Sequence, residues 1–135
     1  MTRRNVPFDR LVLDSGAVIG WERGDAAVRG WLTVAREQQA HVTIPAVVVA
    51  ETVRGTRGDA NVNRCIKAVG HVSSIDEAIG RSAGALLGQT GGSETADALV
   101  VAEASREGRC VVLTGDLEDF RRLAAFAPTV EIVRV

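Results

Sequence analysis

Five short runs of apolar and β-branched residues recur along the chain, and stretches with helical periodicity lie between most of them. The runs cover residues 10–13, 42–44, 72–74, 110–113 and 130–135. Residues 11–13 and 110–113 are continuously apolar, which is typical of strands that helices cover on both faces of a sheet. The alternation of strands with helices predicts an α/β domain built around a mostly parallel sheet.

The segments between these runs carry the start and stop signals of helices. Asp25, Asp76 and Ser93 are placed to cap helices that follow them. Pro45 is expected in the first turn of a helix that Gly55 ends. The expected helical segments are a short turn at 17–21, a longer helix after 25, and helices over 45–54, 61–69, 77–90, 94–107 and 117–126.

Length and composition are those of one globular domain. The chain has 135 residues, of which 46% are hydrophobic and 24% charged, so we expect a single domain over residues 1–135 with its own core. No apolar run approaches the roughly 20 residues of a membrane-spanning helix. The N-terminal segment MTRRNVPFDR lacks the apolar stretch of a signal peptide. We therefore expect a cytoplasmic protein.

The cysteines and histidines give no sign of a metal site. Cys65 and Cys110 lie far apart in the sequence, and so do His41 and His71; none has a neighbour at metal-ligand spacing. We expect both cysteines to be reduced packing residues. For the histidines we expect positions at the surface or at strand ends.

Acidic residues follow the ends of two predicted strands. Asp14 comes directly after the first run, Asp116 comes shortly after the fourth, and Asp119 lies one helical turn later. In parallel sheets, ligands bind outside the carboxyl ends of the strands, so these side chains are expected at one edge of the sheet. For Asp14, a cap on the turn that follows is the alternative.

Two further acids occupy predicted helices. Glu51 lies in VVVAETVRG, among apolar residues, where a buried carboxylate is costly unless it is paired or bound to a cation. Asp97 lies near the start of the helix ETADALVVAEA, with Glu94 three residues earlier. The alternatives are an ion pair of Glu51 with Arg54 and a favourable interaction of Asp97 with the helix dipole.

Taken together, these carboxylates predict a divalent metal site. Like charges that lie close together raise one another's pKa, and a cation removes that conflict. Oxygen ligands favour Mg²⁺ or Mn²⁺ over zinc, and such an ion supports hydrolysis of a phosphodiester bond. The hydroxyl of Thr114 is placed to orient a carboxylate or a water molecule; alternatively, it only ends a strand.

The segments VLDSGAVI, VVVAETVRG, TADALVVAEA and VLTGDLEDF occur in this order and resemble the motifs of the PIN-domain ribonucleases, in particular the VapC-like toxins of type II toxin–antitoxin systems. The resemblance spans nearly the whole chain. It implies a Rossmann-like three-layer α/β/α fold and cleavage of RNA by an endonuclease that depends on Mg²⁺ or Mn²⁺. It also implies a homodimer and a small cognate antitoxin that blocks the site.

Residue by residue, the resemblance assigns functions to the matching positions. The implied catalytic residues are Asp14, Glu51, Asp97, Asp116 and Thr114, and the implied metal ligands are the four acids together with Asp119. The chain departs from the family pattern at Gly115, which stands where a polar residue is more usual. Ser15 and Gly16 are a second departure, which we expect to make the first turn flexible.

Basic residues are unevenly distributed, although the net charge of −1 does not indicate nucleic-acid binding. An exposed basic helix face is one interpretation of the cluster that surrounds Asp59, and contact with RNA phosphates is the other. The candidate contacts are Arg54, Arg57, Arg64 and Lys67, with Arg121 and Arg122 as additions.

Two other functions compete with a nuclease. A phosphohydrolase with an aspartyl nucleophile typically has a second acid two residues after the first, where this chain has Gly16. It also uses a late lysine, whereas Lys67 is the single lysine here. The other competitor is a non-catalytic interaction module whose acids serve as helix caps.

Overall fold

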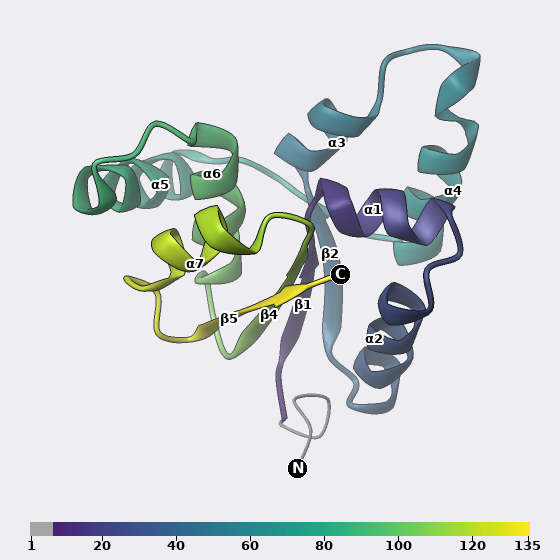
Figure 1. The fold of residues 1–135 in the computed structure, drawn as a ribbon, viewed down its shortest axis with the longest axis horizontal. Helices are drawn as coiled ribbons and strands as arrows, with labels where there is room; N and C mark the ends of the chain where they lie inside the picture. Colours follow the sequence, from purple (N-terminus) through teal and green to yellow (C-terminus); the bar gives the residue numbers. More distant parts are fainter. Residues whose placement is uncertain (1–6) are drawn as a thin grey trace.

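Five parallel strands form the centre of the fold in the computed structural model, which describes residues 7–135 (Figure 1). Most of the N-terminal segment considered above therefore lies outside the described residues. The strands are β1 (Arg10–Leu13), β2 (His41–Pro45), β3 (Val72–Ser73), β4 (Cys110–Thr114) and β5 (Val130–Arg134). Their order across the sheet is β3-β2-β1-β4-β5, and every neighbouring pair is parallel.

Helices cover both faces of this sheet (Figure 1). One layer contains α1 (Ser15–Glu22), α2 (Ala26–Glu37) and α4 (Ala60–Val69), and the other contains α5 (Glu77–Thr90), α6 (Thr95–Ala104) and α7 (Leu117–Ala124). Helix α3 (Ala46–Thr52) lies beyond the carboxyl ends of the strands and contacts both α1 and α6. The predicted three-layer α/β/α, Rossmann-like fold is confirmed.

The central strands are buried on both faces, as their continuous apolar sequences predicted. Leu11, Val12 and Leu13 of β1 have no exposed surface, and neither do Val112 and Leu113 of β4. The registers of these strands pair Leu13 with Leu113. Both strands consequently end at the same level of the sheet, where β1 is followed by Asp14.

Strand order places the topological switch point between β1 and β4. The chain continues from β1 to β2 and β3 on one side, whereas β4 and β5 lie on the other side. Connections therefore diverge from the carboxyl ends of β1 and β4, which is where open α/β sheets form their ligand-binding crevice.

Helix α3 ends earlier than the sequence predicted, and the cause is a local contact between the backbone and the side chain of Asp59. Pro45 is the last residue of β2 and the N-cap residue of α3, and Val53 has already left the helical conformation. The N–H groups of Arg54, Gly55 and Thr56 donate to the carboxylate of Asp59 at 2.7 to 3.2 Å. Because these donors are bound to a side chain, the helix cannot continue through them.

Three other helix boundaries also differ from the sequence expectation. The segment after β1 forms the two-turn helix α1, because its buried Ala17 and Val18 pack into the core. Helix α6 has Glu94, not Ser93, at its N-cap and ends at Ala104. Helix α7 ends at Ala124. The predicted caps Asp25 and Asp76 are confirmed, since each side chain accepts a hydrogen bond from its own helix.

Both cysteines are free and buried, as predicted. Burial raises the pKa of the Cys65 thiol to about 11 and that of Cys110 to about 12. The histidines lie at the surface and at strand ends, as expected, with His41 first in β2 and His71 directly before β3. Because β2 and β3 are paired, Nε2 of His41 lies 3.2 Å from Nδ1 of His71.

Within residues 7–135, the helices lack the length and apolar character needed to cross a lipid bilayer.

Candidate functional site

Asp14 and Thr114 lie side by side at the switch point. Thr114 ends β4, and its hydroxyl donates to Oδ2 of Asp14 at 2.8 Å. Both residues are buried, with Asp14 5% exposed. Burial raises the pKa of Asp14, although the interaction with the Ser15 backbone and the hydrogen bond from Thr114 oppose this effect. Asp14 occupies the N-cap position of α1, but its side chain makes no capping hydrogen bond, so the cap alternative does not explain this acid.

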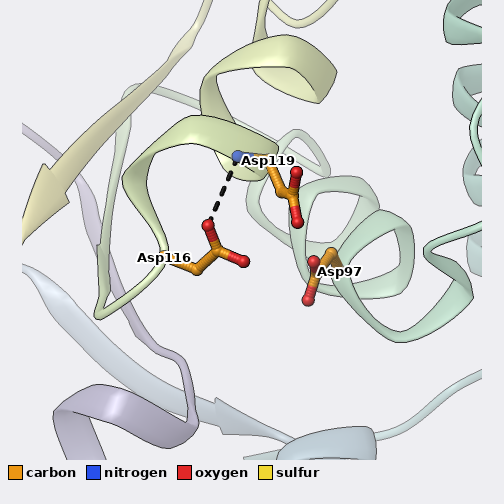
Figure 2. Close-up of side chains that lie close together, drawn as sticks. All are labelled: Asp97, Asp116 and Asp119. Carbon is orange, nitrogen blue, oxygen red and sulfur yellow. Dashed lines mark hydrogen bonds between the residues drawn. The ribbon is translucent and has the colours of Figure 1, made fainter.

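Three aspartates converge next to this pair. Asp97, Asp116 and Asp119, hereafter the acidic trio, each offer a carboxylate oxygen, and these oxygens lie within 4.8 Å of one another. Figure 2 shows the three side chains directed into a common space, with Asp97 on α6 facing the other two at the start of α7. Asp116 also caps α7, because its Oδ1 accepts a hydrogen bond from the Asp119 N–H at 3.4 Å.

The electrostatics of Asp97 show how closely the acids are coupled. Burial is the largest cause that raises its pKa, from 3.8 to about 7. The negative charges of the other acids add to this effect, and they are those of Asp14, Asp116, Glu51 and Asp119. Five carboxylates therefore act on one region, two from the segments that follow β1 and β4 and three from α3, α6 and α7.

Glu51 faces this region from α3 but lies outside the acidic trio. Its side chain is exposed, and its pKa is raised by partial burial and by the negative charge of Asp14. The alternative pairing with Arg54 is not the arrangement found. The Arg54 guanidinium donates to main-chain oxygens at the end of α3, including that of Glu51 at 2.9 Å, rather than to the Glu51 carboxylate.

This constellation has the properties of a divalent cation site. Several carboxylates held together at raised pKa are stabilised when a cation neutralises them. Their ligand atoms are all oxygen, a set that suits Mg²⁺ or Mn²⁺. The raised pKa of Asp97 and the separation of the trio's oxygens are the observations on which this fit depends.

The basic cluster lies beside the acids, on the segment from α3 to α4. Arg54 and Glu51 line the same surface groove of about 480 Å³, together with Ser15 of α1. Arg57 lies in the 3₁₀ helix η2 (Arg57–Asp59), and all four basic side chains of the cluster are exposed. Arg64 and Lys67 belong to α4, where Arg64 donates to Oδ1 of Asn61 at 2.8 Å.

The contacts of two residues near the site, Asp59 and Arg122, were not predicted from the sequence. Asp59 is buried and accepts the N–H groups that shape the loop carrying Arg54, and these hydrogen bonds lower its pKa. Arg122 forms ion pairs with Glu94 and with Asp119, each at 3.0 Å. The i, i+3 spacing of Asp119 and Arg122 is visible in the sequence, but the pairing with Glu94 depends on how α6 and α7 pack.

Gly16 and Gly115 explain how the two loops approach each other. A Cβ atom on Gly16 would lie 2.6 Å from the backbone nitrogen of Gly115, closer than packed atoms come. Gly16 is also part of α1. Gly16 therefore serves close packing between α1 and the loop that leads to Asp116, and the flexibility expected of the first turn stays a prediction.

Comparisons with known proteins agree with this architecture. A chain of VapBC2 from Rickettsia felis, a complex bound to promoter DNA, is similar with a TM-score of 0.72 at 14% identity; the match covers 93% of this chain and 98% of that chain. For VapBC from Salmonella typhimurium bound to DNA, the TM-score is 0.65 at 18% identity with the same coverages. At these identities, the likeness concerns the fold.

Another similar structure is a toxin–antitoxin complex from Klebsiella pneumoniae, with a TM-score of 0.64 at 19% identity and coverages of 90% and 95%. A search of curated protein sequences finds no significant match. The model of the PIN domain matches residues 11–125, which include Asp14, Glu51 and the acidic trio. Because this match covers most of the sequence, the chain belongs to the PIN-domain family, whose members are nucleases.

Proposed function

We propose that this protein is an endoribonuclease that depends on Mg²⁺ or Mn²⁺ and acts as the toxin of a toxin–antitoxin pair. The observation that carries the proposal is the convergence of the acidic trio beside Asp14 at the switch point of the sheet. Membership of a nuclease family supports a phosphodiester as the substrate. A toxin of this kind acts where RNA is, in the cytoplasm.

In this proposal, the acids hold the metal and Thr114 orients one of them. Asp14, Asp97, Asp116 and Asp119 are the metal ligands closest to the switch point, and Glu51 completes the set from α3. A bound divalent ion supplies Lewis-acid stabilisation of phosphoryl charge and lowers the pKa of water. The Thr114 hydroxyl orients the buried Asp14 carboxylate through its hydrogen bond of 2.8 Å, which also favours the charged form of that acid.

Substrate binding is assigned to the groove beside the acids. Arg54 and Glu51 line the same groove, so an RNA backbone held by Arg54 and Arg57 would run past the acidic region. Arg64 and Lys67 on α4 extend this basic surface. Arginine suits such contacts because its planar fork binds phosphate through two hydrogen bonds. His41 is the first residue of β2, and His71 directly precedes β3. Both histidines therefore lie where strands begin, away from the carboxyl ends that carry the acids, and neither is assigned a catalytic role.

The experiment is incubation of total RNA with the purified protein and Mg²⁺, beside the variants Asp14→Asn and Asp97→Asn. Wild type is expected to produce discrete cleavage products that EDTA abolishes, and both variants are expected to lose this activity. A matched control is Asp9→Asn, which replaces an acid at the other end of β1. Cleavage that persists in both site variants contradicts the assignment of the site.

Two parallel measurements separate the competing functions. Hydrolysis of a phosphomonoester without RNA cleavage would support the aspartyl phosphohydrolase. A thermal unfolding temperature that does not respond to Mn²⁺ would support the non-catalytic module, because a ligand that binds the folded state raises stability by mass action.

The partners follow from the same proposal. Three similar structures contain toxin–antitoxin assemblies by name, which supports a small antitoxin protein as the inhibitor of this chain. We further propose that the chain, as one domain over residues 1–135, forms a homodimer. Light scattering on the purified protein tests the dimer, and co-expression with the product of an adjacent small reading frame tests whether RNA cleavage is suppressed.

A further inference from the structure

A single guanidinium links the two helices that carry the acidic trio. Nη2 of Arg122 lies 3.0 Å from Oδ1 of Asp119, and Nη1 lies 3.0 Å from Oε1 of Glu94. Arg122 and Asp119 belong to α7, whereas Glu94 is the N-cap residue of α6, three residues before Asp97. The side chain of Arg122 therefore connects the element that carries Asp97 with the one that carries Asp116 and Asp119.

Glu94 is itself held in place on the α6 side. Its Oε2 accepts a hydrogen bond from the backbone N–H of Ser93 at 3.0 Å. The carboxylate also folds back over Gly92, where any side chain would collide with it. Both oxygens of Glu94 thus have defined partners, and the end of Arg122 that binds Glu94 has a fixed anchor.

Stability alone is a weak reason for this arrangement. The side chains of Arg122, Glu94 and Asp119 are 47%, 29% and 33% exposed, and ion pairs with such exposure contribute little to folding. Orientation is a stronger reason, because a carboxylate has two oxygens. Asp119 can keep one oxygen on Arg122 while the other faces a cation, and partners of this kind are known to tune metal ligands.

We propose that Arg122, anchored by Glu94, is a positioning residue that holds the Asp119 carboxylate toward the acidic trio and thereby strengthens divalent cation binding. This inference rests on the proposed metal site. This role requires a guanidinium group, whose two terminal nitrogens bind Glu94 and Asp119 at the same time. A lysine ammonium is a point charge and lacks this geometry.

Electrostatics alone predicts the opposite result. Arg122 carries a positive charge next to a cation site, so its removal should make the site more attractive to a cation. If Arg122 acts only through its charge, Arg122→Gln binds Mn²⁺ more tightly than wild type and Arg122→Lys binds equally well. If Arg122 positions Asp119, both variants bind Mn²⁺ more weakly. The sign of the change therefore distinguishes the two roles.

The test is isothermal titration of the full chain with Mn²⁺ in the absence of RNA. We expect about a tenfold loss of affinity in Arg122→Gln, a loss in Arg122→Lys, and a smaller loss in Glu94→Gln. The double variant Arg122→Gln/Glu94→Gln should be no weaker than Arg122→Gln alone, because both residues act through one linkage. The matched control is Arg36→Gln, which removes the same charge from the exposed surface of α2, in the other helix layer, and should leave Mn²⁺ affinity unchanged.

Equal or tighter Mn²⁺ binding in Arg122→Gln overturns the inference, and so does full recovery of affinity in Arg122→Lys. A wild type that binds no Mn²⁺ overturns the proposed metal site as well, so the two failures are distinguishable. Circular dichroism verifies that each variant is folded. Arg122→Lys carries the test if Arg122→Gln does not fold, because a role through charge alone predicts unchanged Mn²⁺ affinity in that variant.

Discussion

The hydroxyl of Thr114 donates a hydrogen bond of 2.8 Å to Oδ2 of Asp14, which lies 100 residues earlier in the chain. The same hydroxyl oxygen accepts the backbone N–H of Asp116 at 3.0 Å. One buried side chain thus joins the acid that follows β1 to the loop that carries the acids of α7. This relationship exists only because β1 and β4 are neighbours in the sheet.

Thr114→Val is expected to lower the free energy of unfolding by about 1–3 kcal/mol, because it leaves buried polar groups without their partner. It should also weaken Mn²⁺ binding, since Asp14 loses the donor that favours its charged form. Thr114→Ser keeps the hydroxyl and serves as the control. Urea denaturation and calorimetric titration measure both effects; equal behaviour of the valine and serine variants would contradict the role of the hydroxyl.

The raised pKa of Asp97 predicts a pH dependence of stability in the metal-free protein. A carboxyl group whose pKa rises from 3.8 to about 7 on folding binds its proton more tightly in the folded state. The free energy of unfolding therefore falls as the pH rises through this window. Asp97→Asn removes the effect, so the variant should gain about 1–2 kcal/mol over wild type at about pH 8, allowing for partial solvent screening.

Denaturation of both proteins at about pH 4 and about pH 8 checks this prediction. The comparison between variant and wild type cancels the contributions of titrating groups that do not interact with Asp97. Mn²⁺ added at the higher pH should restore stability to the wild type but much less to Asp97→Asn. A difference between the two proteins that is the same at both pH values would show that Asp97 does not carry the effect.

Gly16→Ala is expected to destabilise the protein by about 1–3 kcal/mol, because the new methyl group would lie 2.6 Å from the Gly115 nitrogen. In an unobstructed helix the same substitution is stabilising by about 0.5–1 kcal/mol. Gly84→Ala in α5 provides that comparison, since a Cβ atom there meets nothing within 4 Å. Thermal unfolding should shift in opposite directions for the two variants, and a stabilising Gly16→Ala would refute close packing at the loop.

Glu103→Ala should destabilise the fold by about 3–5 kcal/mol, because it leaves the Arg10 guanidinium buried and unpaired. The two side chains are 6% and 5% exposed, and their ion pair measures 2.9 Å. Glu77→Ala breaks the exposed pair with Arg81 and should cost less than about 1 kcal/mol. Denaturant unfolding measures both, and Mn²⁺ affinity should be unchanged in folded Glu103→Ala, since Arg10 begins β1 at the end far from Asp14. Similar small effects in both variants would contradict the buried pair.

The sequence by itself determined the class of fold and the positions of the acids along the elements. Continuous apolar runs are a local signal of strands buried on both faces, so β1 and β4 were predicted with nearly their observed bounds. Caps such as Asp25 and Asp76 act on the N–H groups of the next few residues. Each of these features depends on neighbours in the chain, and periodicity and spacing therefore reveal it.

Only the tertiary structure decided which side chains meet. Asp119 joins Asp97 and Asp116 in the trio, whereas Glu51 remains outside it. Arg122 connects Glu94 with Asp119 because α6 packs on α7. His41 approaches His71 because two strands are paired. Such contacts depend on the packing of elements that are distant in sequence. The periodicity of apolar residues reports which face of an element is buried, but it does not report which distant side chain lies against that element.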